Sequence, residues 1–322
     1  MMPHIDSTYI DDLKSNRVIG LPTDTVYGLA ADARVDSAVT EIYALKTRPS
    51  FNPLIIHIHD LQQAQLYGDF NSNALKLAHH FWAPSKTASA LTIVVPYKKG
   101  SGISSLALAG LETIALRIPN HPVALKVLKK FAGPLAAPSA NPSNHLSPTT
   151  TQHVKKAFPK LNVLDGGDCV IGIESTIVWC KDDDVLLLRP GIVTKEQIAA
   201  VVNDSIIDRT DGAVIQVPGA FKKHYAPKTP MVMNVKIPSP GDIYIGFGVR
   251  YPSDINLSES GDLKEAAANL FRYLHQADVQ QAQRIAIAPI PSEGIGAAIN
   301  DRLTRGSVSM SSSASETRPR TH

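Results

Sequence analysis

The 322-residue sequence predicts an α/β fold in two domains. Short apolar runs alternate with helical patterns through the first two hundred residues, which is typical of helices layered on a sheet. From about residue 205 to 230 this alternation lapses into a stretch broken by three prolines, and it then resumes in a shorter unit. We therefore expect a large first domain, a long linker and a small second domain.

The individual elements follow from the period of the apolar residues. In the first domain, strands are expected in the apolar runs at 17–22, 53–58, 90–96, 113–118, 134–138, 174–180 and 184–189. Helices are expected there at 36–46, 72–82, 121–131, 149–157 and 194–202. The later unit should contain a strand at 242–247, a helix at 261–277, a strand at 284–288 and a helix at 293–304. The predicted division is a first domain at 1–205, a linker at 206–230, a second domain at 231–305 and a disordered, serine-rich tail at 306–322.

Composition places the chain among globular proteins. Apolar residues make up 43% and charged residues 19%, no apolar stretch approaches a membrane span, and the first residues are too polar for a signal peptide. Cys169 and Cys180 fit neither a disulfide scaffold nor a zinc spacing, so we expect reduced thiols, a cytoplasmic location and no membrane contact. The net charge is +3, but residues 301–322 hold four arginines against two acids. Charge alone therefore does not establish a basic face for nucleic acid.

The stretch from Gly20 to Ala33, GLPTDTVYGLAADA, leaves its apolar strand in an unusual way. Thr23 and Thr25 flank an acid, and no obvious nucleophile, base or metal ligand accompanies them. The chain also holds no Walker loop, GxGxxG, GxSxG elbow or HExxH motif. We therefore expect chemistry that depends on positioning and charge, without a covalent nucleophile.

Cations and histidines occupy two further segments. Lys46 and Arg48 lie at a helix end, where they could simply offset the helix dipole or, with Asn52, hold an anion such as a phosphate. His57 and His59 share one face of a strand and could begin a metal site. No third ligand has a motif around it, so a ligand contact or a core hydrogen bond by one histidine is favoured.

Polar residues also follow several later strands. Arg117, on one strand face with Thr113, should meet a carboxylate from the protein or from a ligand if it is buried, and is otherwise a surface arginine. In PLAAPSANPSNHLSPTT, small residues precede a series of side-chain donors, which suits close approach to a ligand, although Asn-Pro also marks ordinary turns. Ser175 opens a strand in GIESTIVWC, and Arg189 stands at the end of another in LLRPG.

These segments, in this order, resemble the YrdC-like family in its two-domain form, the threonylcarbamoyl-AMP synthases. The matching motifs are PTDTVYGL, K-x-R-P followed by NPLIIHI, RIPNH, APSAN-x-S, ESTIV, LRPG and HYAPKTP. They extend from about residue 10 to 230, and the last is specific to members with a C-terminal domain. The resemblance implies a twisted mixed-sheet catalytic domain around a basic cavity, and a small Rossmann-like α/β C-terminal domain.

The resemblance also implies an activity. The family makes threonylcarbamoyl-adenylate from L-threonine, bicarbonate or CO₂, and ATP, with release of pyrophosphate. A partner transferase then moves the group to an adenosine of certain tRNAs. Chemically, the neutral amine of threonine attacks CO₂, and the carbamate oxygen attacks the α-phosphorus of ATP. Mg²⁺ should accompany ATP, and the resemblance assigns no metal ligand to the protein.

Matched motif by motif, the resemblance assigns residues to the two substrates. L-Threonine should meet Thr25, His57, Arg117, the backbone at Ala137, and Ser175. ATP should meet Lys46, Arg48, Asn52, Thr113, Ser139, Asn141, Ser147, Arg189 and, from the linker, Tyr225. Thr25 would then bind a small zwitterion rather than attack a substrate.

Alternatives remain for the activity and for the linker. An RNA-binding module would suit a basic cavity, and weak RNA binding is possible, but basic and aromatic residues are not interleaved for base stacking. A nucleotide sensor without catalysis is a third hypothesis. The linker could fold over the cavity as a lid with Tyr225 against ATP, or it could be a spacer along the surface. Its length and its prolines favour the lid.

Overall fold

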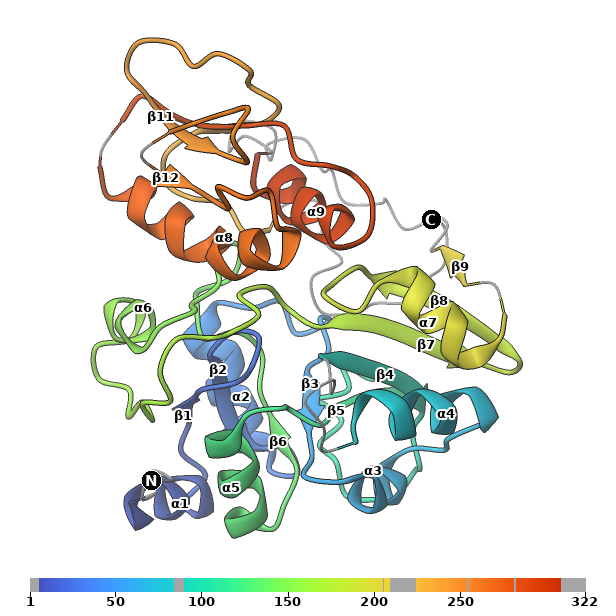
Figure 1. The fold of residues 1–322 in the computed structure, drawn as a ribbon. Coiled ribbons are helices and arrows are strands. Elements are labelled where there is room, and N and C mark those ends of the chain that lie inside the picture. Colours follow the sequence, from blue (N-terminus) through green and yellow to red (C-terminus); the bar gives the residue numbers. More distant parts are fainter. Residues whose placement is uncertain are drawn as a thin grey trace, which may run out of the picture.

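The computed structural model describes residues 6–83, 90–204, 206–208, 224–253, 255–280 and 282–307. Figure 1 shows two units, a larger one with a broad twisted sheet and a smaller one that packs against it. The mixed α/β class predicted from the sequence is confirmed. Most of the predicted linker and tail, residues 209–223 and 308–322, lies outside the described residues.

The larger unit is built on a mixed sheet of nine strands within the described residues. Their spatial order is β1 (Ile19–Leu21), β2 (Gly28–Asp32), β6 (Leu135–Ala136), β3 (Ile55–His57), β5 (Thr113–Arg117), β4 (Leu91–Pro96), β7 (Thr176–Lys181), β8 (Asp184–Arg189) and β9 (Ile207–Asp208). In the parallel pair β3–β5, His57 lies opposite Arg117. This register places the two side chains next to each other on one face of the sheet.

Helices pack around this sheet (Figure 1). They are α1 (Ser7–Lys14), α2 (Asp36–Lys46), α3 (Leu61–Tyr67), α4 (Ser72–Phe81), α5 (Pro122–Phe131), α6 (Thr151–Ala157) and α7 (Lys195–Val202). Proline in the first turn starts α5, and Thr194 and Gln197 form a capping box at the start of α7. Among the described residues, each helix is too short or too polar to cross a lipid bilayer. Cys169 and Cys180 are buried free thiols, and burial raises the pKa of Cys180 to about 12.

Four elements of the larger unit are not predicted from the sequence: α1, α3, β2 and β9, the last of which lies in the predicted linker. Strand β2 reads GLAAD, and such small residues carry little strand propensity of their own. Its position is set by pairing with β1 and β6, which is a non-local effect. Helix α1 is short and buries Ile10 and Leu13 in one cluster with residues of α5, so its apolar period is brief.

The smaller unit has a sheet of four parallel strands within the described residues, which agrees with the predicted Rossmann-like character. Its elements are β10 (Met231–Val232), β13 (Arg284–Ile287), β11 (Asp242–Gly246), β12 (Ile255–Asn256), α8 (Leu263–Asp278) and α9 (Ile295–Ser307). Gly306 and Ser307 belong to α9, so the predicted start of the tail at 306 is too early. A β-carbon at Gly306 would lie 2.7 Å from the carbonyl oxygen of Tyr225, so the close approach of α9 to that segment requires glycine here.

The two units share a core. In Figure 1, α8 and α9 lie between the second sheet and the larger unit. Val26 and Ile173 of the larger unit belong to the same buried cluster as Phe271 of α8 and Leu303 of α9. Gly172 has a positive φ of 76°, and a β-carbon there would lie 2.5 Å from the carbonyl oxygen of Ala267. The loop backbone therefore rests directly on α8, which requires glycine at this position.

Candidate active site

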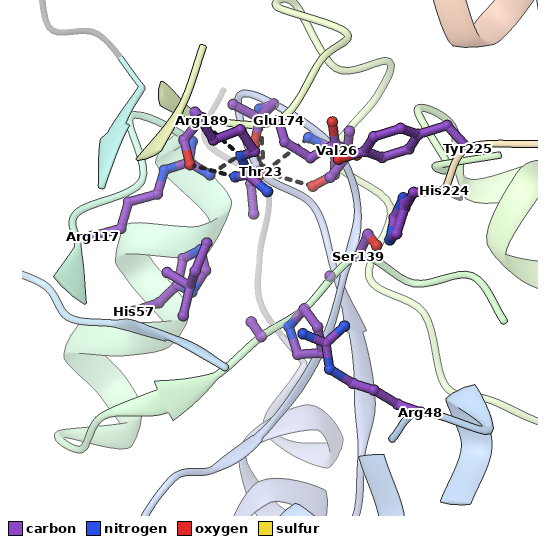
Figure 2. A pocket seen from close by; sticks show the side chains of 16 residues that line it. Thr23, Val26, Arg48, His57, Arg117, Ser139, Glu174, Arg189, His224 and Tyr225 are labelled. Atoms are coloured by element: carbon purple, nitrogen blue, oxygen red, sulfur yellow. Dashed lines mark hydrogen bonds between the residues drawn. The ribbon is translucent and has the colours of Figure 1, made fainter. Parts of the chain in front are cut away.

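A pocket lies where loops at several strand ends of the first sheet meet the segment that enters the second unit (Figure 2). About 550 Å³ of space lies between its lining atoms, part of it open to solvent. The lining consists of Thr23, Thr25, Val26, Gly28, Arg48, Ile55, His57, Arg117, Ala137, Pro138, Ser139, Glu174, Ser175, Arg189, His224 and Tyr225. Several polar side chains converge there among apolar ones, which is typical of a site for a small molecule.

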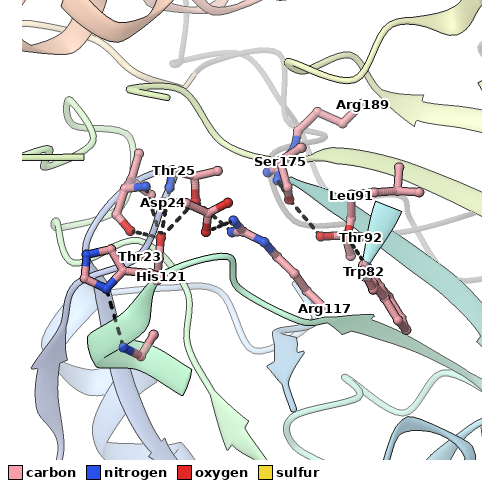
Figure 3. Close-up of polar contacts among 12 residues, drawn as sticks. Thr23, Asp24, Thr25, Trp82, Leu91, Thr92, Arg117, His121, Ser175 and Arg189 are labelled. Atoms are coloured by element: carbon pink, nitrogen blue, oxygen red, sulfur yellow. Dashed lines mark hydrogen bonds and ion pairs between the residues drawn. The ribbon is translucent and has the colours of Figure 1, made fainter. Parts of the chain in front are cut away.

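The two threonines after β1 have different tasks. The hydroxyl of Thr23 donates to the carbonyl oxygen of Val26 at 2.6 Å and accepts from the backbone N–H of Thr25 at 3.2 Å. Thr23 thus builds the turn, as Ser and Thr hydroxyls do in many loops. The hydroxyl of Thr25 instead accepts from Nη1 of Arg117 at 2.7 Å (Figure 3). The two hydroxyls lie 3.0 Å apart, so Thr23 supports Thr25, which contacts Arg117.

Arg117 is buried and meets a carboxylate of the protein. Its Nη2 lies 2.6 Å from Oδ1 of Asp24, and the two side chains are 4% and 2% exposed. Of the alternatives that the sequence leaves open, the structure selects the buried arginine with a protein partner. A buried pair of this kind fixes the direction of the guanidinium, since breaking it would leave a charge without compensation.

His57, next to Arg117 across the β3–β5 pair, is neutral at physiological pH. Burial lowers its pKa to about 3, and the positive charge of Arg117 acts in the same direction. His59 lies beyond the strand and pairs with Asp60 at 3.2 Å. Of the two histidines, only His57 lines the pocket.

Two further arginines line the pocket. Arg189, the last residue of β8, donates through Nε to the carbonyl oxygen of Ser175 at 3.0 Å and through Nη2 to its hydroxyl at 3.1 Å. That hydroxyl also lies 2.7 Å from the hydroxyl of Thr92 (Figure 3). Arg48 donates to the carbonyl oxygens of Asn52 and Pro53 at 3.2 and 2.9 Å. Burial lowers the pKa of Arg48 to about 10, so it remains charged at neutral pH.

Nine of the fourteen predicted site residues line the pocket, and five do not: Lys46, Asn52, Thr113, Asn141 and Ser147. Lys46 is buried beneath the loop, where its Nζ donates to the carbonyl oxygens of Ser139 and Asn141. Thr113 begins β5, four residues from Arg117, and pairs with Pro96.

The remaining three also serve the framework. The backbone carbonyl of Asn52 accepts from Arg48, the Asn141 amide donates to the carbonyl oxygen of His145 at 2.9 Å, and the hydroxyl of Ser147 donates to Glu174. The sequence shows the donor types of such residues, but not the direction in which each one points.

Several lining residues were missed by the sequence argument, above all Glu174 and His224. Both stand inside the quoted motifs, in ESTIV and HYAPKTP, where Ser175 and Tyr225 were chosen instead. The carboxylate of Glu174 accepts from Ser147 and from Arg302 of α9, the latter at 3.2 Å. Burial and nearby cations lower the pKa of His224 to about 3, despite the opposing effect of Glu174.

Buried polar atoms without a partner mark where a ligand would complete the hydrogen bonding. Among the described residues, four that line the pocket keep such an atom: Nδ1 of His57, Nε of Arg117, Nδ1 of His224 and the hydroxyl of Tyr225. Most buried polar groups in native proteins are paired, so this concentration in one pocket indicates a polar ligand. In Figure 2, His57 and Arg117 lie on one side of the pocket, and His224 and Tyr225 on the other.

The fold and the site define a class of protein: a mixed sheet with helices carries a basic pocket, and the segment that leads into a Rossmann-like second domain completes the pocket wall. Such a protein binds a small polar ligand. The chain belongs to the Sua5/YciO/YrdC family, whose sequence model, described as "Telomere recombination", matches residues 11–191. A second model, "Threonylcarbamoyl-AMP synthase, C-terminal domain", matches residues 193–307.

Individual relatives extend this result over nearly the whole chain. The chain is 37% identical to a threonylcarbamoyl-AMP synthase of Bacillus subtilis, over 91% of this chain and 90% of the relative. It is 32% identical to one of Pyrococcus abyssi, over 92% of each. A crystal structure of P. abyssi Sua5 complexed with L-threonine superposes with a TM-score of 0.84 and 29% identity, over 95% of this chain and 96% of that one. The family predicted from the motifs is confirmed.

Proposed function

We propose that this protein synthesises L-threonylcarbamoyl-AMP from L-threonine, bicarbonate or CO₂, and ATP, with release of pyrophosphate. Relatives that carry the name of this enzyme align with nine-tenths of the chain or more. The observation that carries the proposal is the set of buried polar atoms without partners, divided between two sides of one basic pocket. For tRNA modification, the product would pass to a partner threonylcarbamoyl transferase.

L-Threonine is proposed to bind at the side formed by Thr25, His57, Arg117, Ser175 and the backbone at Ala137. Nε of Arg117 and Nδ1 of His57 are the buried atoms available there. A group with a pKa of about 3 is a poor base at neutral pH, so His57 would orient the amino acid rather than deprotonate its ammonium group.

ATP is proposed to bind on the other side, against Arg48, Ser139, Arg189 and Tyr225. Attack of the carbamate oxygen on the α-phosphorus builds negative charge on phosphoryl oxygens. The two arginines supply fixed positive charge in a site shielded from water, where such stabilisation is strongest. Lys46, Asn52, Asn141 and Ser147 would act by holding these loops, and Thr113, at the start of β5, does not line the pocket.

Mg²⁺ would be held by the phosphates of ATP. Within the described residues, no three His, Cys, Asp or Glu side chains are grouped to hold a metal ion. Both carboxylate oxygens of Glu174 are already engaged, by Ser147 and Arg302. The part of the chain that the structure describes therefore offers no grouped ligands for a metal ion, and the usual arrangement for Mg²⁺ leaves most ligands to phosphates and water.

The predicted division into a catalytic domain at 1–205, a linker at 206–230 and a second domain from 231 is part of the proposal, and so is the lid. Tyr225 supports the lid, because it is 1% exposed, lines the pocket and keeps its hydroxyl without a partner in the described part of the chain. A cytoplasmic location is proposed as well, since reduced buried thiols suit that compartment.

The proposal is tested by incubating the full chain with ATP, bicarbonate and one amino acid at a time, and measuring pyrophosphate. L-Threonine should support release that depends on bicarbonate, and L-valine, which lacks the hydroxyl, should support much less. Release no faster with threonine than without an amino acid would refute the synthase. Tight binding of single-stranded RNA in that case would favour the RNA-binding alternative.

A further inference from the structure

A fully buried arginine reaches from the second domain to the wall of the pocket. Arg302 lies on α9, and its side chain is 0% exposed. Its Nε lies 3.2 Å from the carboxylate of Glu174, and Nη2 donates to the backbone carbonyl of the same residue at 3.2 Å. Nη1 donates to the carbonyl oxygen of Pro190, directly after Arg189. One guanidinium thus holds the start of β7 and the end of β8 together.

Glu174 needs this cation. It is a buried carboxylate in the lining of a pocket proposed to hold a triphosphate. Burial by itself would raise its pKa, but the charges of Arg302 and Arg189 outweigh this and hold the pKa below its usual value. The carboxylate is therefore ionised, and without Arg302 its charge would repel the phosphates and draw Arg189 away from them.

The same arginine supports the tyrosine of the lid. The guanidinium carbon of Arg302 lies 5.7 Å from the ring centroid of Tyr225, within the range of a cation–π contact. Phe271 of α8 lies against the same ring, with 5.5 Å between the centroids. Tyr225 has a positive φ of 62°, which is unusual for a residue with a side chain, so its placement depends on these surroundings. The residue before it is also held by α9: the backbone N–H of His224 donates to the carbonyl oxygen of Arg305 at 3.2 Å.

We propose that Arg302 is a positioning residue for ATP, which acts through Glu174 and Tyr225, so that the second domain completes the nucleotide side of the pocket. This inference rests on the proposed function. It assigns the second domain a part in binding the nucleotide and predicts a much smaller effect on threonine. In the described residues, Arg117 contacts Asp24 and Thr25 and its strand pairs with that of His57, all within the first domain.

The test measures the Kd values of ATP and of L-threonine separately, by calorimetry, for the full chain and four variants. Arg302→Met should weaken ATP binding about tenfold or more, the expected loss when hydrogen bonds to a charged group are removed. The threonine Kd of this variant should stay within about twofold of the wild-type value, because substitutions far from a binding site usually change its free energy of binding very little. Arg302→Lys keeps the cation but loses the fork, so its loss should be smaller. Combining Arg302→Met with Glu174→Gln should recover part of the ATP affinity, because the uncompensated carboxylate is gone.

The fourth variant, Arg284→Met, is the matched control. It breaks the pair of Arg284 with Asp242, at 2.6 Å, within the second domain and away from the pocket, so ATP affinity should match the wild type. If Arg302→Met does not fold, the ATP Kd of Arg302→Lys tests the role of Arg302 by itself. An ATP Kd unchanged in the folded Arg302 variants, or a threonine Kd weakened as much as that of ATP, would overturn the inference. A wild type that binds ATP but releases no pyrophosphate with threonine would refute the proposed reaction, and the ATP Kd values would still decide the role of Arg302.

Discussion

Arg117→Lys separates the two sides of the pocket most directly. The substitution keeps a positive charge next to Asp24, so the buried carboxylate is still compensated and the fold should persist. It removes the fork whose terminal nitrogens lie 2.6 Å from Asp24 and 2.7 Å from the hydroxyl of Thr25. It also removes the Nε atom that has no partner in the described residues and is proposed to meet threonine.

The size of the effect follows from these contacts. A hydrogen bond to a charged group contributes about 1.5–3 kcal/mol, which corresponds to about 10- to 150-fold in an equilibrium constant. We therefore expect the KM of threonine to rise by about that factor, and the KM of ATP to change by less than about threefold. The assay is pyrophosphate release, with each substrate varied while the other is saturating. An equal rise in both KM values would refute the assignment of Arg117 to the threonine side.

Three other substitutions or conditions test the site. Ser139→Ala should weaken ATP binding while the thermal midpoint without ligand changes little, because the side chain lines the pocket and its backbone carbonyl still accepts from Lys46; a large loss of stability would show a structural role. Tyr225→Ala should lower product yield and ATP affinity, and Tyr225→Phe, which keeps the ring on Arg302, should lose less; equal losses would show that the hydroxyl dominates. Acid should destabilise the fold, since His57 and His224 have folded-state pKa values of about 3, below the usual value of about 6.5. Each lowered pKa contributes stability that is fully present above about pH 6.5 and is lost as the pH falls towards 3, by up to about 1.4 kcal/mol per pH unit. Urea unfolding of the wild type and of His224→Asn between pH 4 and 7 should show a shallower loss in the variant; parallel curves would contradict this.

The sequence predicts those site residues that stand in a motif beside a strand, and it does not predict those that only tertiary packing brings to the pocket. Thr25, His57 and Arg117 line the pocket as the sequence predicts, because each follows or ends an apolar strand in a recognisable motif, and Ser175 directly precedes such a strand. Glu174 was missed although it stands next to Ser175, since a lone acid gives no sign that it faces a pocket. Arg302 could not be found, because 128 residues separate it from Glu174 and only the docking of α9 brings the two together.

The fold shows the same division. Elements with a strong period, such as α5 and β4, appear close to their predicted bounds because local apolar pattern and tertiary burial agree. Strand β2 does not, because its alanines and glycine are held in the sheet by their neighbours. Packing also favours glycine at position 28, because a β-carbon there would lie 3.3 Å from the carbonyl oxygen of Pro138, in the wall of the pocket.

The pairing of His57 with Arg117 across two parallel strands has a consequence for how the substrates arrive. The hydrogen-bond ladder of one sheet fixes the backbone of both residues, and Asp24 and Thr25 hold the guanidinium of Arg117, so this geometry is preformed and costs little entropy to use. The opposite wall is built from loops and from His224 and Tyr225, which contact Arg305 and Arg302 of the second domain. The geometry of this wall therefore depends on how the second domain packs against the first. If the proposed function holds, selectivity for the amino acid would reside in the half of the pocket built on the sheet, and admission of the nucleotide in the half built from loops and the second domain. Threonine would then be able to bind before ATP.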